Sequence, residues 1–265
     1  METDENSERR TYRGGWIEDF LVALVFLTRL PVSLPFTFEM SAIKSACRCF
    51  PLIGLIVGGL TGTLYLMATF VGLPPWVSAL LAVAAQVLLT GALHEDAIGD
   101  VADGFGGGVD KTRKLEIMRD SRMGTYGVVA LILVIGLKTA TIAHIDNPFT
   151  VFAVLVAAAA CSRGIMTWAL FLMPPAREDG LGHGSGRPEL SAPLWSTAIF
   201  MGVSIAVLGN YMGAAAMLAA MIGGSLMGLV ARRQIGGQTG DVLGAIQQIS
   251  EIFFLLACVA ALGSS

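Results

Sequence analysis

The residues of this chain best suited to chemistry lie in one acidic stretch, from His94 to Gly104. Within it, Asp96, Asp100 and Asp103 are spaced at i, i+4 and i+7, so a helix would carry them on one face. Like charges at this spacing repel each other, which disfavours a purely structural role. Carboxylate oxygens are ligands that Mg²⁺ prefers, often together with substrate phosphates. The stretch therefore predicts a metal site for a phosphorylated substrate, with a solvated acidic face as the alternative.

A second acidic pair follows in the same segment. Glu116 and Asp120 are four residues apart, so a short helix would direct both side chains the same way. Between the two acidic sets lies the glycine-rich run 104–108, and glycines allow a backbone to approach a ligand closely. Together, the two sets contain enough carboxylates for two metal ions.

The overall composition indicates which kind of protein must position these residues. The chain has 265 residues, of which 54% are hydrophobic and 14% charged, and its mean hydropathy is +0.70. A water-soluble domain of this size does not need so much apolar surface. The net charge of −3, without a basic stripe, argues against nucleic acid as a partner. We therefore expect an integral protein of the lipid bilayer.

Apolar segments of about 20 residues are long enough to cross a bilayer as helices. We predict spans at residues 50–72, 76–93, 124–145, 149–173, 192–209, 211–231 and 249–263. Charged residues interrupt the segment from Trp16 to Leu34, which favours an interfacial or re-entrant helix. The expected fold is an all-α polytopic membrane bundle of about seven transmembrane helices. A disordered cytoplasmic tail would occupy residues 1–15, and a single catalytic membrane domain, with an active-site loop at 94–123, would occupy residues 16–265.

Basic residues indicate how the bundle is oriented. Fourteen of the seventeen Lys and Arg residues fall on one predicted face, whereas the turns at 73–75, 146–148 and around Asn210 contain none. The positive-inside rule makes the basic face cytoplasmic, provided that the segment 16–34 does not cross. The longer connections would then share the cytoplasmic side, and these are residues 94–123, 175–191 and 232–248.

Glycines recur every four residues in the first predicted span, at Gly54, Gly58 and Gly62. This spacing allows two helix backbones to approach closely. We expect a tightly packed helix pair at this face.

Two basic residues lie inside predicted spans, where charge is costly and often functional. Arg163 and Lys138 are candidates to reach substrate phosphates or to pair with acidic residues. The alternative is snorkelling, in which a long side chain extends to the membrane surface. Both interpretations stay open for Arg163, while snorkelling is favoured for Lys138, which is nearer the outer turn.

Several separate motifs occur in a recognisable order between about Phe20 and Leu256. They are Phe26–Pro31, Phe50–Gly54, His94–Gly104, Glu116–Gly124, Ser162–Gly164 and Gly236–Asp241. This set resembles the cobalamin synthase family, the adenosylcobinamide-GDP ribazoletransferases. That family usually has His-x-Asp-Gly-x-x-Asp-x-x-Asp-Gly, whereas here Ala97 replaces the first glycine and Glu95 stands where an apolar residue is common. Alanine is a good helix former, so the change would stiffen the turn without removing a ligand.

The resemblance implies a transferase of cobalamin biosynthesis in the bacterial cytoplasmic (inner) membrane. Its substrates would be adenosylcobinamide-GDP and α-ribazole, or α-ribazole 5′-phosphate, and GMP would leave. Residues expected to bind substrate are Arg163, Lys138, Arg119, Arg122, Gln238, Asp241 and His94. A homo-oligomer stays open.

The acidic motif also resembles, more distantly, the signature of the CDP-alcohol phosphotransferases. There, two aspartates three apart precede a glycine, and two further acidic residues follow four apart. On that analogy the Mg²⁺ ligands would be Asp100, Asp103, Glu116 and Asp120, with Asp96 as an additional ligand or a supporting group. Asp120 would be the general base, and Asp103 would also take part in catalysis.

The main alternative from another class of protein is a transporter or channel. Charged residues within the spans would suit a pathway across the bundle. Transporter sites, however, usually lie at broken helices between inverted repeats, and the sequence shows neither. The acidic residues also lie at the predicted edge of the membrane, which favours an enzyme.

Overall fold

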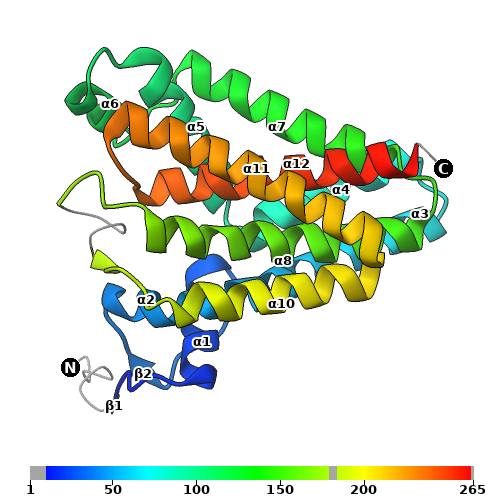
Figure 1. Cartoon of the computed structure of the whole chain (residues 1–265). Helices are drawn as coiled ribbons and strands as arrows, with labels where there is room; N and C mark the ends of the chain where they lie inside the picture. Colours follow the sequence, from blue (N-terminus) through cyan, green and yellow to red (C-terminus); the bar gives the residue numbers. More distant parts are fainter. Residues whose placement is uncertain (1–9, 179–183, 264–265) are drawn as a thin grey trace, which may run out of the picture.

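The computed structural model describes residues 10–178 and 184–263, and nearly all of its regular structure is helical. The long helices lie along a common direction (Figure 1). They are α3 (Phe50–Phe70), α4 (Pro75–Thr90), α7 (Thr125–Ala143), α8 (Pro148–Leu172), α10 (Ser191–Leu208), α11 (Asn210–Ile235) and α12 (Gly240–Leu262). Six of these are long and apolar enough to cross a membrane, and α4 meets the same test only together with the helix that follows it. The predicted all-α membrane bundle is confirmed.

Shorter elements gather at one end of the bundle (Figure 1). They are β1 (Arg10–Thr11), α1 (Trp16–Leu27), β2 (Phe36–Thr37), α2 (Ile43–Ala46), α5 (Leu93–Gly107), α6 (Lys111–Ile117) and the 3₁₀ turns Met40–Ala42 and Cys47–Cys49. At 12 residues, α1 is too short to span a bilayer, as its interrupting charges predict. Strand β1 pairs in parallel with β2 and ties the chain before α1 to the segment after it.

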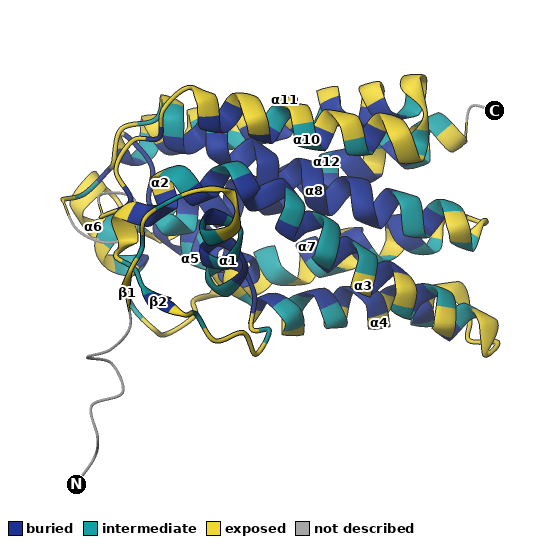
Figure 2. Cartoon of the chain, turned by 90° about the horizontal axis from the view of Figure 1, so that it is seen from below, coloured by how far each residue is buried: buried dark blue, intermediate teal, exposed yellow. Residues whose placement is uncertain are grey.

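The core of the bundle is built around α8 and α12. These two helices are largely buried, whereas α7, α10 and α11 expose most of their surface (Figure 2). Helix α8 packs closely against α3 at the predicted glycines. A Cβ added to Gly54 would lie 2.2 Å from the Ala159 carbonyl oxygen, and one added to Gly58 would lie 2.5 Å from that of Leu155. Only glycine permits this approach, so the predicted helix pair is confirmed.

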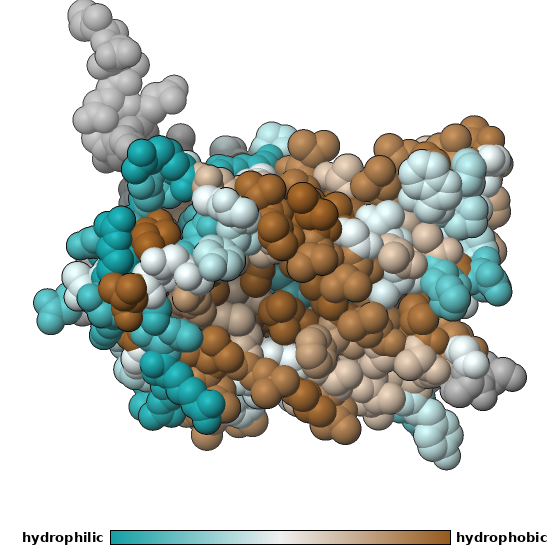
Figure 3. Space-filling model, turned by 90° about the horizontal axis from the view of Figure 1, so that it is seen from above, coloured by the Kyte–Doolittle hydropathy of each residue, from teal (hydrophilic) through white to brown (hydrophobic). Residues whose placement is uncertain are grey.

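The two ends of the bundle differ in charge. The described basic residues before α1, of α2, of α6 and of the last turn of α11 lie at the end that carries α5, while α12 ends at the other (Figure 1). Figure 3 shows hydrophilic side chains gathered at this end and hydrophobic ones over the middle of the same face. From α3 to α12 the chain passes along the bundle seven times, and α4 provides one of these passages.

The chain turns sharply between α4 and α5. The two helix axes are bent by 90°. The bend is made by Gly91 (φ 65°) and Ala92 (φ 59°), both left-handed, a conformation that alanine rarely adopts. The loop after α1 packs against it, because the backbone N–H of Arg29 donates to the Leu89 carbonyl at 2.7 Å. Helix α5 therefore starts a new direction at the polar end and does not continue the crossing of α4.

Three sequence-based boundaries differ from the structure. The last span begins at Gly240, whereas the prediction placed its start at residue 249. Residues 232–248, predicted as a connection, are mostly helical. The polar side chains of Gln247, Gln248 and Glu251 form hydrogen bonds inside the bundle, so this part of the chain can be buried as a helix. Residues 94–123, predicted as a loop, contain α5 and α6.

The predicted disordered tail needs a similar correction. Residues 1–9 lie outside the described part of the chain, but residues 10–15 are held in place. The Glu18 carboxylate accepts the backbone N–H groups of Arg13 (2.7 Å) and Gly14 (3.0 Å), and it pairs with Arg10. These contacts, added to the β1–β2 pairing, fix the chain just before α1.

Candidate active site

Four aspartates come together where α5 meets the start of α12. Asp96, Asp100 and Asp103 lie on α5, and Asp241 lies in the first turn of α12. Asp96, Asp103 and Asp241 each act electrostatically on Asp100. We call these four residues the acidic edge cluster. The predicted single face of the helix is present, and the tertiary structure adds a fourth carboxylate to it.

The electrostatics of the cluster show an excess of negative charge. Partial burial and the neighbouring carboxylates raise the pKa of Asp100 from its ordinary value of 3.8 to about 7. Burial is the largest cause, and Asp96 is the largest of the three charged neighbours. Arg177 is a cation beside the cluster, and its Nη2 lies 3.8 Å from Asp241 Oδ2. A positively charged ligand would relieve this repulsion.

Asp103 has a structural partner that the sequence did not reveal. Its carboxylate accepts the backbone N–H groups of Gly124 (2.6 Å) and Gly127 (2.9 Å), at the start of α7. The first N–H groups of a helix have no partner within the helix, so a carboxylate here accepts their hydrogen bonds and is stabilised by the positive end of the helix dipole. A Cβ at Gly127 would lie 2.4 Å from Asp103 Oδ2, so the glycine makes room for the contact. Asp103 therefore joins α5 to α7.

The second acidic pair is engaged with arginines. Glu116 pairs with Arg113 at 3.0 Å, and Asp120 pairs with Arg122 at 2.7 Å. The hydrogen bonds from Arg122 lower the pKa of Asp120 from 3.8 to about 2. Glu116 lies on α6 and Asp120 on the connection to α7.

Deeper in the bundle lies a second set of charges, which we call the buried ion cluster: Glu95, Lys138, Arg163 and Glu251. Lys138 Nζ lies 3.1 Å from Glu251 Oε2 and 3.9 Å from Glu95 Oε1. Arg163, which is fully buried, lies within electrostatic range of both glutamates. Lys138 is 1% exposed, so the prediction that it snorkels to the surface is wrong. Two cations and two anions balance each other.

Glutamines donate hydrogen bonds to both glutamates of the buried ion cluster. Gln86 and Gln247 donate to Glu251 at 2.7 Å each, and Gln248 donates to Glu95 at 2.8 Å. A buried charge is tolerated when it is paired and hydrogen-bonded in this way. Glu251 and the glutamines were not among the predicted site residues, although polar residues within an apolar span are a usable signal.

A cavity of about 270 Å³ opens beside the acidic edge cluster. Its charged residues are Asp96, Arg177 and Asp241, and the remaining lining is mostly apolar. His94 also lines it and is almost fully buried. Its Nε2 atom has no hydrogen-bond partner within the described part of the chain. The predicted substrate-binding residues His94 and Asp241 thus share one cavity.

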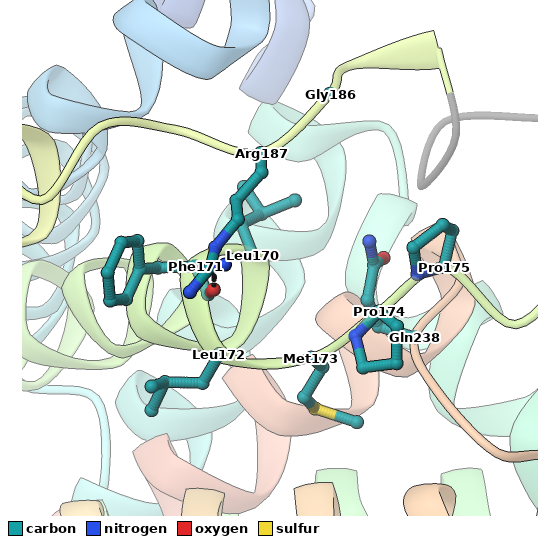
Figure 4. A pocket seen from close by; sticks show the side chains of 9 residues that line it. All are labelled: Leu170, Phe171, Leu172, Met173, Pro174, Pro175, Gly186, Arg187 and Gln238. Carbon is teal, nitrogen blue, oxygen red and sulfur yellow. Dashed lines mark hydrogen bonds between the residues drawn. The ribbon is translucent and has the colours of Figure 1, made fainter.

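The segment before α12 is tied to the end of α8. Gln238 exchanges two backbone hydrogen bonds, donating to Pro174 and accepting from Ala176, both at 2.8 Å. The buried Gln238 lines a second cavity, of about 470 Å³. Figure 4 shows Gln238 beside Pro175, and shows Arg187 reaching to the Phe171 carbonyl. That contact is a hydrogen bond of 2.8 Å, and the Arg187 guanidinium stacks on the Phe171 ring at 4.5 Å.

The remaining predicted residues are spread around this end. Arg119 acts electrostatically on Asp241, whereas the side chain of Arg122 is largely exposed and engaged with Asp120. Arg163 and Lys138 belong to the buried ion cluster, not to the acidic edge cluster. The structure therefore brings together Asp96, Asp100, Asp103, Asp241 and His94, whereas Glu116 and Asp120 pair with arginines close to them in sequence.

The chemistry of the acidic edge cluster fits a hard divalent cation, because its donors are carboxylate oxygens with unbalanced charge. As the side chains stand, no three His, Cys, Asp or Glu residues among those described converge closely enough to hold a metal ion. The Mg²⁺ site therefore stays a prediction that requires reorientation of these side chains.

Comparison with known proteins agrees with the motifs. The family model described as cobalamin-5-phosphate synthase matches residues 19–259. The chain belongs to this family. A Bradyrhizobium diazoefficiens protein named adenosylcobinamide-GDP ribazoletransferase is 46% identical over 248 residues, which cover 92% of this chain and 94% of that protein. A Mesorhizobium japonicum protein of the same name is 42% identical over 255 residues, covering 94% and 95%.

An Allorhizobium ampelinum protein of that name is 40% identical over 258 residues, which cover 93% of this chain and 98% of that protein. The cobalamin-5-phosphate synthase match spans α1 to α12 and contains both charged clusters. No solved structure gives a significant match. The distant similarity to CDP-alcohol phosphotransferases stays a prediction.

Proposed function

We infer that the chain is a membrane-embedded ribazoletransferase of cobalamin biosynthesis. It transfers the adenosylcobinamide phosphoryl group from adenosylcobinamide-GDP to α-ribazole, or to its 5′-phosphate, and releases GMP. The observation that carries this inference is family membership over residues 19–259, with relatives of this name matched along almost their whole length. The acidic edge cluster and its cavity form the site best suited to the reaction.

The reaction is a displacement at phosphorus. A hydroxyl oxygen of the ribazole attacks the phosphorus that carries cobinamide, and the bond from that phosphorus to the departing GMP oxygen breaks. The hydroxyl proton passes to a carboxylate. Asp120 is the predicted acceptor, and its pair with Arg122 must first open, since a carboxyl with a pKa of about 2 is a weak base.

We propose that Asp96, Asp100 and Asp241 hold Mg²⁺ in the working enzyme. The cation would offset charge on the diphosphate and on the departing GMP. The surroundings of these carboxylates support the proposal, because partial burial and the charges of the neighbouring aspartates raise the pKa of Asp100 to about 7. Asp103 contributes by holding the start of α7 against α5.

A transporter is not favoured. The charged residues inside the bundle pair with one another, since Lys138 contacts Glu251 and Glu95. Such a neutral, hydrogen-bonded group stabilises the bundle and does not suit a pathway for ions.

We propose that the polar end of the bundle faces the cytoplasm of a bacterial inner membrane. The one-sided basic residues support this orientation. In intact cells, a cysteine at Gly107 should be shielded from a membrane-impermeant thiol reagent, and one at Asn147 should be labelled. All four native cysteines are buried and free, so background labelling should be low. The reverse pattern would overturn the orientation.

The proposed activity is tested with detergent-solubilised protein, adenosylcobinamide-GDP, α-ribazole and Mg²⁺. We expect GMP and a cobalamin product, and a loss of both when EDTA removes the metal. Asp96→Asn should reduce the rate at least tenfold. The matched control is Asp146→Asn, the same change at an exposed residue of the α7–α8 connection, which should keep the wild-type rate. Wild-type protein that releases no GMP would refute the proposed function.

A further inference from the structure

The cavity beside the acidic edge cluster is divided into a polar mouth and an apolar interior. Asp96 is exposed, and Arg177 and Asp241 are partly exposed, so these three residues form the mouth. The interior is lined by buried residues of α2, α3, α5, α8 and α12. Its large apolar side chains are Ile43, Phe50, Met166, Leu170 and Leu243.

The volume limits what the cavity can hold. Small-molecule pockets run upward from roughly 300 Å³, so a cavity of about 270 Å³ suits one small ligand or part of one. A corrin macrocycle is far larger than this. The apolar walls also disfavour the phosphates of GDP, which need cations or amides around them.

One polar group lies within the buried lining. His94 is 1% exposed, and its Nε2 atom lacks a hydrogen-bond partner in residues 10–178 and 184–263. A buried polar atom without a partner is costly, which points to a ligand atom that completes it. The ligand should therefore be mainly apolar, with a single hydrogen-bonding atom.

We propose that this cavity binds the base of α-ribazole, with its ribose at the mouth and His94 Nε2 hydrogen-bonded to the base. The inference rests on the proposed function. The base is a dimethylated benzimidazole, which is flat, apolar and aromatic, and it has one ring nitrogen free to accept a hydrogen bond. With the base inside, the ribose hydroxyls lie next to Asp96 and Asp241, where the phosphoryl group is to be received.

The neighbouring cavity is less suitable for this base. Arg187 and Gln238 place polar groups in its lining, and it is larger, at about 470 Å³. The two cavities share Leu170. With the nucleoside base in the smaller cavity, the larger cavity is free to hold part of the other substrate.

The first test enlarges the cavity. Met166→Ala should raise the KM for α-ribazole about tenfold and leave the KM for adenosylcobinamide-GDP within twofold, since removing apolar contacts weakens the ligand that they touch. Met217→Ala is the matched control: Met217 is similarly buried, but it lies on α11 and outside the cavity. It should change neither KM. An unchanged KM for α-ribazole, or a rise confined to adenosylcobinamide-GDP, would overturn the inference while leaving the function intact.

The second test isolates His94. An indole riboside has the same shape but no accepting nitrogen, so wild-type protein should have a KM about tenfold higher for it than for the benzimidazole riboside. In His94→Phe this ratio should fall toward one, because phenylalanine has a similar size but no hydrogen-bond donor. GMP release measures both rates. A ratio that is unchanged by the substitution would exclude the proposed hydrogen bond.

A third measurement needs no variant. A photoreactive azido-benzimidazole riboside, bound to the wild-type protein, should label residues 93–97 or 240–244, as located by mass spectrometry. Labelling on α4 or α7, whose facing groove is also apolar, would place the base elsewhere. Wild-type protein that makes no cobalamin would instead refute the proposed function itself.

Discussion

Neighbouring residues of α5 belong to two different charged regions. Glu95 points into the bundle and is 5% exposed, while Asp96 is exposed at the edge. In the buried ion cluster, two acids meet two bases, and glutamines donate to the carboxylates. In the acidic edge cluster, four acids meet beside a cavity, and partial burial together with the neighbouring carboxylates raises the pKa of Asp100 to about 7.

The difference teaches how to separate structural charges from functional ones. A balanced and fully buried group stabilises one arrangement of helices, and removing one partner leaves an uncompensated charge. An unbalanced and accessible group costs stability and is retained for what it binds. Removing a charge from the buried ion cluster should therefore lower the free energy of unfolding, whereas neutralising the accessible Asp96 should change it little.

The largest effect on stability is expected from Lys138→Met. The substitution keeps most of the side-chain volume but leaves Glu251 without its ion-pair partner, at a cost of about 3–5 kcal/mol. Thermal unfolding in detergent and the amount of folded protein in membranes measure the loss.

The double variant Lys138→Met with Glu251→Gln should recover part of that stability, because it removes both opposite charges. A single variant as stable as wild type would show that the buried ion cluster contributes little. No recovery in the double variant would assign the loss to packing instead of charge.

Asp103→Asn is expected to cost about 1–2 kcal/mol, because an amide can accept only one of the two backbone N–H groups that the carboxylate now accepts. Asp146→Asn, at the opposite end, serves as the control in the same unfolding assay. Equal stabilities of the two variants would show that the hydrogen bonds from Gly124 and Gly127 to Asp103 do not stabilise the fold.

Asp100 should make the stability of metal-free protein depend on pH. Its pKa is raised in the folded state, from 3.8 to about 7, so the folded state favours the protonated form. That contribution is present at low pH and is lost as pH rises from about 4 to about 7. With EDTA present, wild type should be more stable at pH 5 than at pH 8 by on the order of 1 kcal/mol relative to Asp100→Asn. Parallel pH profiles would contradict this.

The smallest stability effect is expected from Asp96→Asn. Exposed substitutions without special contacts usually stay within about 0.5 kcal/mol, and this one also reduces repulsion. Its rate of cobalamin formation should nevertheless fall sharply. Stability and activity that decline together would place Asp96 among the structural residues and weaken the comparison between the two clusters.

Local patterns in the sequence were sufficient for much of the fold. The lengths of the apolar segments predicted the spans, the one-sided basic residues predicted a polar end, and Gly54 and Gly58 predicted the close pairing that α3 makes with α8. The spacing of Asp96, Asp100 and Asp103 also predicted a shared helix face. Each of these features depends on residues that are near one another in the chain.

The tertiary structure decided which charges meet. Asp241 joins the aspartates of α5 across more than a hundred residues, while Glu116 and Asp120 stay with arginines close in sequence. Lys138 is buried because Glu251, on another helix, neutralises it. The direction of α5 follows from the left-handed backbone conformation of Ala92, which the helical periodicity of the sequence does not predict. Contacts between distant segments depend on how whole helices pack, so spacing along the chain could not determine them.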